Sequence, residues 1–173
     1  EGLAAEWWRT IKPGGVVVWV VADATVDGSE TGTSFRQALH FKEIGFRLHD
    51  TMIWNKGGFT AVGSVQIRYA PVFEFMFVFS KGQPSKFNPI RDKVILNTDT
   101  RAFRTIRQKD GTTKRLPHTP NPTFAGACGI RYNVWDVPNP GIPGNQHPAT
   151  FPESLARDHI LSWSNEGDTV LDP

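Results

Sequence analysis

The first apolar residues of the chain recur at the spacing of one helix face. They are Leu3, Trp7, Trp8 and Ile11. Residues 12–15, Lys-Pro-Gly-Gly, end this pattern, and residues 16–21 then read Val-Val-Val-Trp-Val-Val without a polar position. A β-branched run that is apolar on both faces is typical of a strand in a sheet covered on both sides. We therefore predict a helix over 3–11 and a strand over 16–21.

The next segments alternate in the same way between helix and strand. Thr33 or Ser34 can cap a helix that continues to about Glu43. Residues 46–54 alternate between apolar and polar positions, and residues 71–79 form a strongly apolar run, so both are predicted strands.

Residues 82–144 break this pattern. They contain eight of the thirteen prolines and little long-range apolar periodicity, which predicts an irregular insert with short strands or one short helix near 99–108. Thr150-Phe-Pro-Glu153 has the form of a capping box and predicts a helix with its N-terminus at 151–154. Residues 168–172 are a predicted last strand.

This order of helices and strands predicts an α/β fold. We expect a mostly parallel sheet with 16–21 in the centre, 71–79 antiparallel near one edge, and 168–172 on the other side of 16–21. Asp23 follows the central strand, at the end where open α/β sheets bind ligands.

Charge is distributed unevenly along the chain, although the net charge is only +2. Residues 81–117 carry ten basic and three acidic side chains, and the remainder carries nine basic and fourteen acidic ones. A basic insert on an acidic body favours a polyanion partner, with a solvated basic loop as the alternative. The candidate DNA-binding residues are Arg91, Lys93, Arg101, Arg104, Arg107, Lys109, Lys114 and Arg115. On a helix, the three arginines at 101, 104 and 107 would share one face.

Composition argues against several other classes of protein. One cysteine, Cys128, excludes an internal disulfide and fits a reducing compartment, so we expect a cytoplasmic protein. The five histidines lack the spacing of a metal site. No apolar run reaches the ~18 residues of a membrane span, so we expect no membrane partner.

Four segments in a fixed order resemble a known family. They are Trp8-Arg-x-x-Lys-Pro-Gly-Gly15, Asp50-Thr-Met-Ile-Trp-Asn-Lys56, the strand with Arg68, Glu74 and Lys81 around it, and Asn145-Gln-His-Pro-Ala-Thr-Phe-Pro-Glu-Ser-Leu155 with Gly167-Asp-Thr-Val-Leu-Asp-Pro173. The set resembles the permuted, beta-type DNA amino-methyltransferases, which modify adenine N6 or cytosine N4. The resemblance covers about residues 3–81 and 134–173.

The resemblance implies a Rossmann-like methyltransferase sheet that uses S-adenosylmethionine and acts on double-stranded DNA. Residues 1–81 would be the catalytic-side half, 82–144 the target-recognition insert, and 145–173 the start of the cofactor-side half. The implied cofactor-binding residues are His147, Pro148, Ala149, Phe151 and Asp172. We expect Arg68 and Glu74 to form a structural pair and Lys56 to contact phosphate or solvent. A homodimer is left open.

Two family motifs do not occur in these 173 residues. The sequence has no Pro-Pro dipeptide, which the catalytic motif requires, and no Gly-x-Gly, which the cofactor loop requires. We therefore name no catalytic residue, expect the chain to be part of a longer enzyme, and expect it alone to be inactive and to bind S-adenosylmethionine weakly or not at all. The alternatives are a non-catalytic nucleic-acid-binding protein on a Rossmann-like scaffold and a different α/β enzyme, for instance a nucleotide-binding one.

Overall fold

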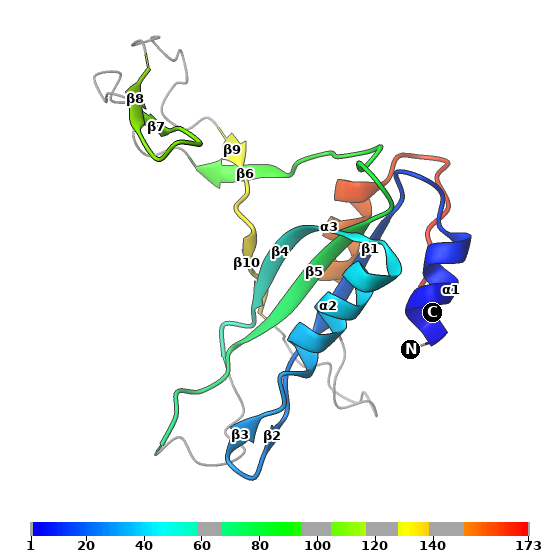
Figure 1. The fold of residues 1–173 in the computed structure, drawn as a ribbon, viewed down its shortest axis with the longest axis vertical. Helices are drawn as coiled ribbons and strands as arrows, with labels where there is room; N and C mark the ends of the chain where they lie inside the picture. The colour runs from blue at the N-terminus through cyan, green and yellow to red at the C-terminus, as the bar shows by residue number, and fades with distance from the viewer. Residues whose placement is uncertain (1, 59–66, 95–104, 117–127, 139–150, 173) are drawn as a thin grey trace. The chain divides into compact units, whose positions relative to one another are not determined.

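The computed structural model describes residues 2–58, 67–94, 105–116, 128–138 and 151–172. The chain divides into two compact units (Figure 1). The first, here called the sheet unit, comprises Glu1–Ile90 and Tyr132–Pro173, and the second, the insert unit, comprises Arg91–Arg131. Both boundaries of the insert unit lie inside the insert predicted at 82–144.

A mixed four-stranded sheet forms the centre of the sheet unit. Its order is β1 (Val16–Val21), β5 (Phe73–Ser80), β4 (Arg47–Asn55) and β10 (Val134–Asp136). Strand β5 is antiparallel to both of its neighbours, and β10 is parallel to β4. The expectations of a mixed α/β fold and of an antiparallel strand at 71–79 are confirmed, but two of the three pairings are antiparallel, so the mostly parallel pairing is wrong.

Strand β5, not β1, occupies the interior of this sheet. Met76 and Val78 on one face of β5 and Phe79 on the other have no exposed surface. Strand β1 also packs on both faces, but it has one paired neighbour among the described strands and all its residues are half-buried. The prediction that the strand at 16–21 packs on both faces is confirmed. The predictions that this strand is central and that 71–79 lies near an edge are wrong. Strand order depends on pairing partners that a local run of valines does not specify.

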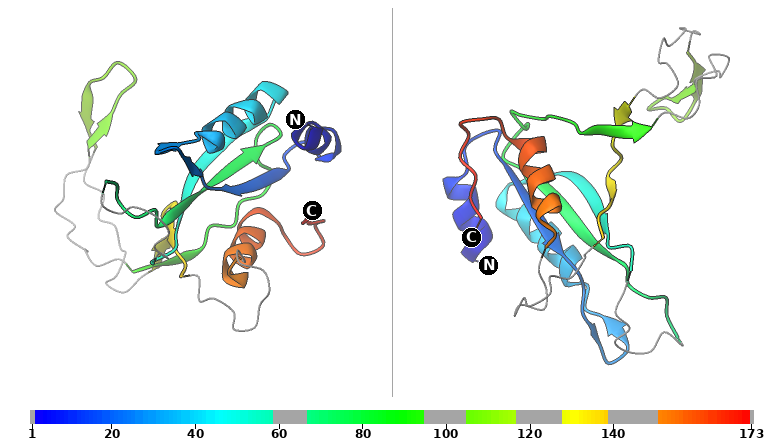
Figure 2. Two further views of the ribbon diagram at one scale, coloured as in Figure 1. Left: turned by 90° about the horizontal axis from the view of Figure 1, so that it is seen from below. Right: turned by 180° about the vertical axis from the view of Figure 1, so that it is seen from behind.

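Helices cover both faces of the sheet. On one face, α1 (Gly2–Thr10) and α2 (Thr33–Ile44) contribute Ala4, Ala38 and Phe41 to the core around Phe77 and Phe79. On the other face, α3 (Glu153–Trp163) places Leu155 in the core that includes Met76, Val78, Trp54 and Trp135. Figure 2 shows α2 and α3 on opposite sides of the strands. The predicted helices at 3–11 and from 33 are confirmed.

Lys81 joins the end of β5 to the end of α1. Its ammonium group donates to the carbonyl oxygens of Trp8 (2.6 Å) and Ile11 (3.0 Å) and lies 4.8 Å from the centroid of the Trp8 ring. Positive charge is favourable at a helix C-terminus, where carbonyl groups lack helical partners. Lys81, one of the family-like residues, therefore has a structural role in this fold.

Residues 168–172 do not form the predicted strand. They are described without regular structure, and Val170 and Leu171 are 51% and 73% exposed. A short apolar segment becomes a strand only when a neighbour accepts its backbone hydrogen bonds, and no described strand lies beside this one. The expectation of a strand at 168–172 on the other side of 16–21 is therefore wrong.

Three short ladders complete the described structure. In the sheet unit, β2 (Thr25–Val26) pairs with β3 (Ser29–Glu30). In the insert unit, β6 (Arg91–Val94) pairs with β9 (Cys128–Ile130), and β7 (Thr105–Arg107) pairs with β8 (Thr113–Arg115). All three pairs are antiparallel. The two pairs in the insert unit confirm the short strands predicted for the insert.

The burial of β5 predicts the cost of truncating it. Phe79→Ala should lower the free energy of unfolding by about 3–5 kcal/mol, because it removes a fully buried ring that stacks on Phe41. Phe35→Ala is the matched control, since Phe35 is 55% exposed and should cost about 1 kcal/mol, the value of its ring contact with Phe75. Urea unfolding measures both. Equal losses would contradict the assignment of β5 as the centre of the core.

Candidate active-site edge and nucleic-acid interface

The ends of three strands meet at one edge of the sheet. Because β1 and β4 are each antiparallel to β5, they run in the same direction, and β10 runs with β4. Their carboxyl ends and the start of β5 therefore share an edge, here called the carboxyl edge. Its polar side chains are Asp23, Asn55, Lys56, Glu74 and Asp136. This is the position at which open α/β sheets place their ligands.

At this edge, the carboxylate of Asp23 caps helix α2. Its Oδ1 atom accepts hydrogen bonds from the Ser34 backbone N–H (3.1 Å) and the Thr31 hydroxyl (3.0 Å), and its Oδ2 accepts from the Ser34 hydroxyl. The hydrogen bond from the Ser34 hydroxyl is the main reason that the pKa of Asp23 lies below its ordinary value. The N-cap residue of α2 is Gly32, which has no side chain to cap with. Asp23 thus supplies the cap that the sequence analysis assigned to Thr33 or Ser34.

Lys56 and Glu74 form an ion pair at the same edge, with Nζ and Oε1 3.1 Å apart. Both side chains are about three-quarters buried. Glu74 faces Trp54 across the β4–β5 ladder, so Lys56, two residues further along, reaches it directly. The pairing of Arg68 with Glu74 was therefore wrong. Arg68 instead donates to the Gly28 carbonyl oxygen (2.6 Å) and the Thr25 hydroxyl (3.2 Å) of the β2–β3 hairpin.

Phe151 is the predicted cofactor residue that the structure places at the carboxyl edge. Its ring centroid lies 5.8 Å from that of Trp54, near the end of β4, and its side chain is 54% exposed. Trp54 is buried and donates its Nε1–H to the Val137 carbonyl oxygen (2.7 Å), which fixes the surface beneath Phe151. His147, Pro148 and Ala149 lie outside the described residues.

Helix α3 begins beside Phe151 and ends at the opposite edge of the sheet. Its last residue, Trp163, contacts His49 near the start of β4. The helix starts at Glu153, later than predicted, with Pro152 as N-cap and no side-chain cap. Glu153 adds a negative charge to the first turn, which weakens the expected attraction of this helix end for a cofactor carboxylate. Asp172 is exposed and outside the sheet, so its predicted place at a strand end is wrong.

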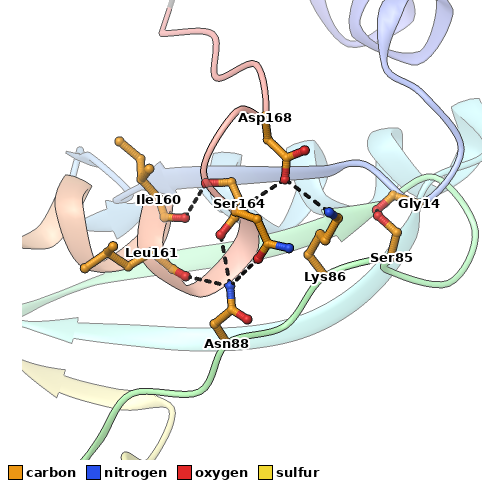
Figure 3. A network of polar contacts seen from close by, with 9 residues as sticks. Gly14, Ser85, Lys86, Asn88, Ile160, Leu161, Ser164 and Asp168 are labelled. Atoms are coloured by element: carbon orange, nitrogen blue, oxygen red, sulfur yellow. Dashed lines mark hydrogen bonds and ion pairs between the residues drawn. The ribbon is translucent and has the colours of Figure 1, made fainter.

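Asn88 holds the C-terminal end of α3 (Figure 3). Its side-chain amide donates to the carbonyl oxygens of Leu161 (3.2 Å) and Ser164 (2.9 Å) and to Asn165 Oδ1 (2.9 Å). Asp168 continues the network, because its carboxylate accepts from the Asn165 N–H (2.8 Å) and lies 3.5 Å from Lys86 Nζ. These contacts attach the segment after α3 to the connection between β5 and β6.

The predicted DNA-binding residues fall into three groups. Arg107 lies in β7, Lys109 in the turn that follows, and Lys114 and Arg115 in β8, and all four are exposed. Arg91 and Lys93 lie in β6, whose Asp92 pairs with Arg131 of the same unit, with Arg131 Nε 2.9 Å from Asp92 Oδ2. Arg101 and Arg104 lie outside the described residues.

The helix expected near 99–108 is wrong over 105–107, where the chain forms a hairpin strand. The signal was present in the sequence. Asp110-Gly111 between Thr-Ile-Arg and Thr-Thr-Lys is a turn dipeptide flanked by β-branched residues, which favours a hairpin. The arginine spacing of three had left a short helix open as the alternative to short strands.

A family model described as DNA methylase matches residues 1–173. The chain belongs to this DNA methylase family, which confirms the resemblance carried by its ordered motifs. It is 48% identical over 181 aligned residues to the orphan methyltransferase M.BamHII of Bacillus amyloliquefaciens, an alignment that covers 100% of this chain. Two type II methyltransferases, M.Cfr9I of Citrobacter freundii and M.SmaI of Serratia marcescens, are 30% and 26% identical over 142 residues, or 82% of this chain. The chain spans 66% of the length of M.BamHII and 38% of that of M.Cfr9I.

Within the described residues, no helix has the length and apolar composition that a membrane span requires. The same residues contain no group of three or more histidine, cysteine, aspartate or glutamate side chains arranged to hold a metal ion.

The cap supplied by Asp23 predicts a pH-dependent contribution to stability. Because the folded-state pKa is lowered, this contribution is present above the unfolded pKa of about 3.9 and is lost as the pH falls through the lower folded value. Asp23→Ala should destabilise the protein by about 1 kcal/mol at pH 7, the usual cost of losing a cap, and by less below pH ~3.9. Urea unfolding over this range measures the difference. Asp23→Asn is the control, since it retains an acceptor oxygen without the charge. A destabilisation by Ala that stays constant with pH would contradict the assignment.

The Asn88 network predicts a local effect on the segment after α3. Asn88→Asp should increase amide hydrogen exchange at 165–168 more than Asn88→Ala, because it turns a negative oxygen toward three acceptor oxygens. Gln83→Ala, which removes an exposed amide from the same connection, is the control and should leave these rates unchanged. Equal rates in all three variants would show that Asn88 does not hold this segment.

Proposed function

We propose that this chain is part of an enzyme that transfers a methyl group from S-adenosylmethionine to the exocyclic amine of adenine (N6) or cytosine (N4) in double-stranded DNA. The match of the DNA methylase family to all 173 residues carries this proposal. The methyltransferase relatives and the four ordered segments support it. In this reading, the mixed sheet is part of a Rossmann-like methyltransferase sheet in a cytoplasmic enzyme.

The carboxyl edge is the proposed location of the cofactor. Phe151 supports this assignment, because it presents an exposed aromatic surface there on a rigid base formed by Trp54. His147, Pro148 and Ala149 complete the proposed cofactor set at this edge on the strength of the family resemblance. Asp172 lies outside the sheet and is proposed from that resemblance alone. S-adenosylmethionine supplies the methyl group when it is bound. The task of these side chains is to orient it and to exclude water.

The fit of the edge to this cofactor follows from charge. S-adenosylmethionine carries a positively charged sulfonium, so an unpaired cation close to it would be unfavourable. The positive charge of Lys56 is matched by Glu74, and the negative charge of Asp23 is engaged by α2. The charges of Lys56, Glu74 and Asp23 are therefore engaged within the protein, and the aromatic surface of Phe151 is exposed for packing.

The insert unit is the proposed holder of DNA. Lys and Arg side chains neutralise phosphates and release counterions, which makes binding strong at low salt and weak at high salt. The exposed residues of the β7–β8 hairpin and Arg91 provide such charges. Extrusion of the target base from the duplex costs a few kcal/mol, so a tight hold on the flanking DNA is required.

The proposal predicts a defined product. The full product of the gene, incubated with mixed-sequence DNA and labelled S-adenosylmethionine, should yield N6-methyladenine or N4-methylcytosine on nucleoside analysis. Label on cytosine C5, on RNA alone or on protein would contradict it. DNA binding without any methyl transfer would instead favour a non-catalytic nucleic-acid-binding protein.

The 173-residue chain provides the matched comparison in the same assay. We expect it to transfer no methyl group, because its sequence contains neither a Pro-Pro dipeptide nor a Gly-x-Gly. We also expect weak or no binding of S-adenosylmethionine in calorimetric titration. A dissociation constant in the micromolar range or below would contradict this expectation and show that the 173-residue chain is sufficient for cofactor binding.

A further inference from the structure

The β7–β8 hairpin of the insert unit is a two-stranded antiparallel ribbon with a defined register. Three cross-strand pairs form it: Thr105 with Arg115, Ile106 with Lys114, and Arg107 with Thr113. All six residues are exposed. The ribbon therefore presents its side chains outward in two sets, since neighbours along a strand point to opposite faces.

The two faces of this ribbon differ in chemistry. The first face, here called the arginine face, carries Thr105, Arg107, Thr113 and Arg115. The second carries the pair Ile106 and Lys114. Two planar guanidinium groups and two hydroxyl groups thus share one face, while the other face has a single point charge beside an aliphatic side chain.

The tip of the ribbon is closed by several hydrogen bonds. The N–H of Gln108 donates to the Thr112 carbonyl oxygen (2.7 Å), and the N–H of Gly111 donates to the Gln108 carbonyl oxygen (3.0 Å). Asp110 accepts from both the N–H (2.9 Å) and the hydroxyl (2.7 Å) of Thr112. Gly111 has a φ of 84°, a conformation that favours glycine. These bonds fix the turn and hence the register of the two faces.

We propose that this ribbon enters the major groove of DNA and that its arginine face reads base pairs, with Arg107 and Arg115 each contacting a G·C pair. The inference rests on the proposed function, because it takes DNA as the substrate. The major groove is about 12 Å wide and admits a two-stranded ribbon. Arginine donates in a bidentate manner to O6 and N7 of guanine, and threonine can contact a base edge or the thymine methyl group.

The spacing of the two arginines matches the spacing of base pairs. Arg107 and Arg115 lie on opposite strands of the ribbon and are offset by two residues along it. Two residues of a strand span roughly 7 Å, which is about two base-pair steps of 3.4 Å. Each arginine therefore meets a different base pair. Lys109 at the tip and Lys114 on the second face are assigned to phosphate contacts, which carry no sequence information.

Three substitutions that conserve charge test the assignment in the full gene product. Arg107→Lys and Arg115→Lys remove the guanidinium fork and keep the positive charge, and Lys114→Arg is the matched exchange on the second face. Selection of bound duplexes from a random library measures the sequence preference of each variant. Salt titration of the binding of one duplex by fluorescence anisotropy reads the phosphate contribution.

We expect each arginine variant to lose roughly 5- to 150-fold of its preference for guanine at one position, with the two positions about two base pairs apart. The slope of log affinity against log salt should stay unchanged in all three variants, since each phosphate contact contributes roughly 0.9 to it and no charge is lost. Lys114→Arg should leave the sequence preference as it is in the wild type.

The outcomes separate this inference from the proposed function. Unchanged preference in both arginine variants, or a preference altered by Lys114→Arg alone, overturns the assignment of the arginine face. Methylation of DNA without any sequence preference overturns the inference and leaves the proposed function standing. A base preference that depends on the two arginines, without any methyl transfer, supports the inference and overturns the proposed function. Failure of the wild-type protein to bind DNA overturns both.

Discussion

A strand that is apolar on both faces sets the architecture of the sheet unit. Strand β5 has Phe77 and Phe79 on one side and Met76 and Val78 on the other, and their exposure ranges from 0% to 3%. Such a strand requires paired neighbours and a covering layer on each face. Helices α1 and α2 provide one layer and α3 the other. The positions of all three helices follow from this requirement.

The direction of β5 also determines where the polar groups of the candidate site lie. Because β5 runs against both neighbours, β1 and β4 end at the same edge and bring Asp23, Lys56 and Glu74 to one side of the molecule. The helices that flank this edge begin there, α2 beside Asp23 and α3 beside Phe151. Core packing and the arrangement of the candidate site are thus consequences of one antiparallel strand.

Local patterns were sufficient to predict most helices and strands, but not their arrangement. The helix that starts near Thr33 and the strand that contains Val16 follow from periodicity and from flanking glycines, which act within a few residues. Strand order depends on pairing between distant segments, and so the central place of β5 could not be read from valine content. The capping role of Asp23 was hidden for the same reason, since its partner Ser34 is eleven positions away.

For the candidate site too, the sequence predicts individual residues but not the contacts between distant segments. Four candidate residues follow from charge alone and are exposed as that requires: Arg107, Lys109, Lys114 and Arg115. Their hairpin was not specified, because the pattern left short strands and a short helix as alternatives. Phe151 was assigned through family resemblance, and its contact with Trp54 at the end of β4 has no counterpart in the sequence pattern. Charge and composition thus indicate candidate side chains, and tertiary structure decides which of them lie together.

Both ends of the insert unit are anchored separately in the sheet unit, and this has an evolutionary consequence. On the entry side, Asn88 is bonded to the end of α3, and on the exit side, the Ile53 N–H donates to the Asn133 carbonyl oxygen (2.8 Å) at the start of β10. With both ends held, doubling the length of the inserted segment would cost only about 0.6 kcal/mol of chain entropy. Under the proposed function, related genes could therefore lengthen, shorten or exchange this segment by recombination while the packed core stays the same, which would give new target sequences without a new enzyme.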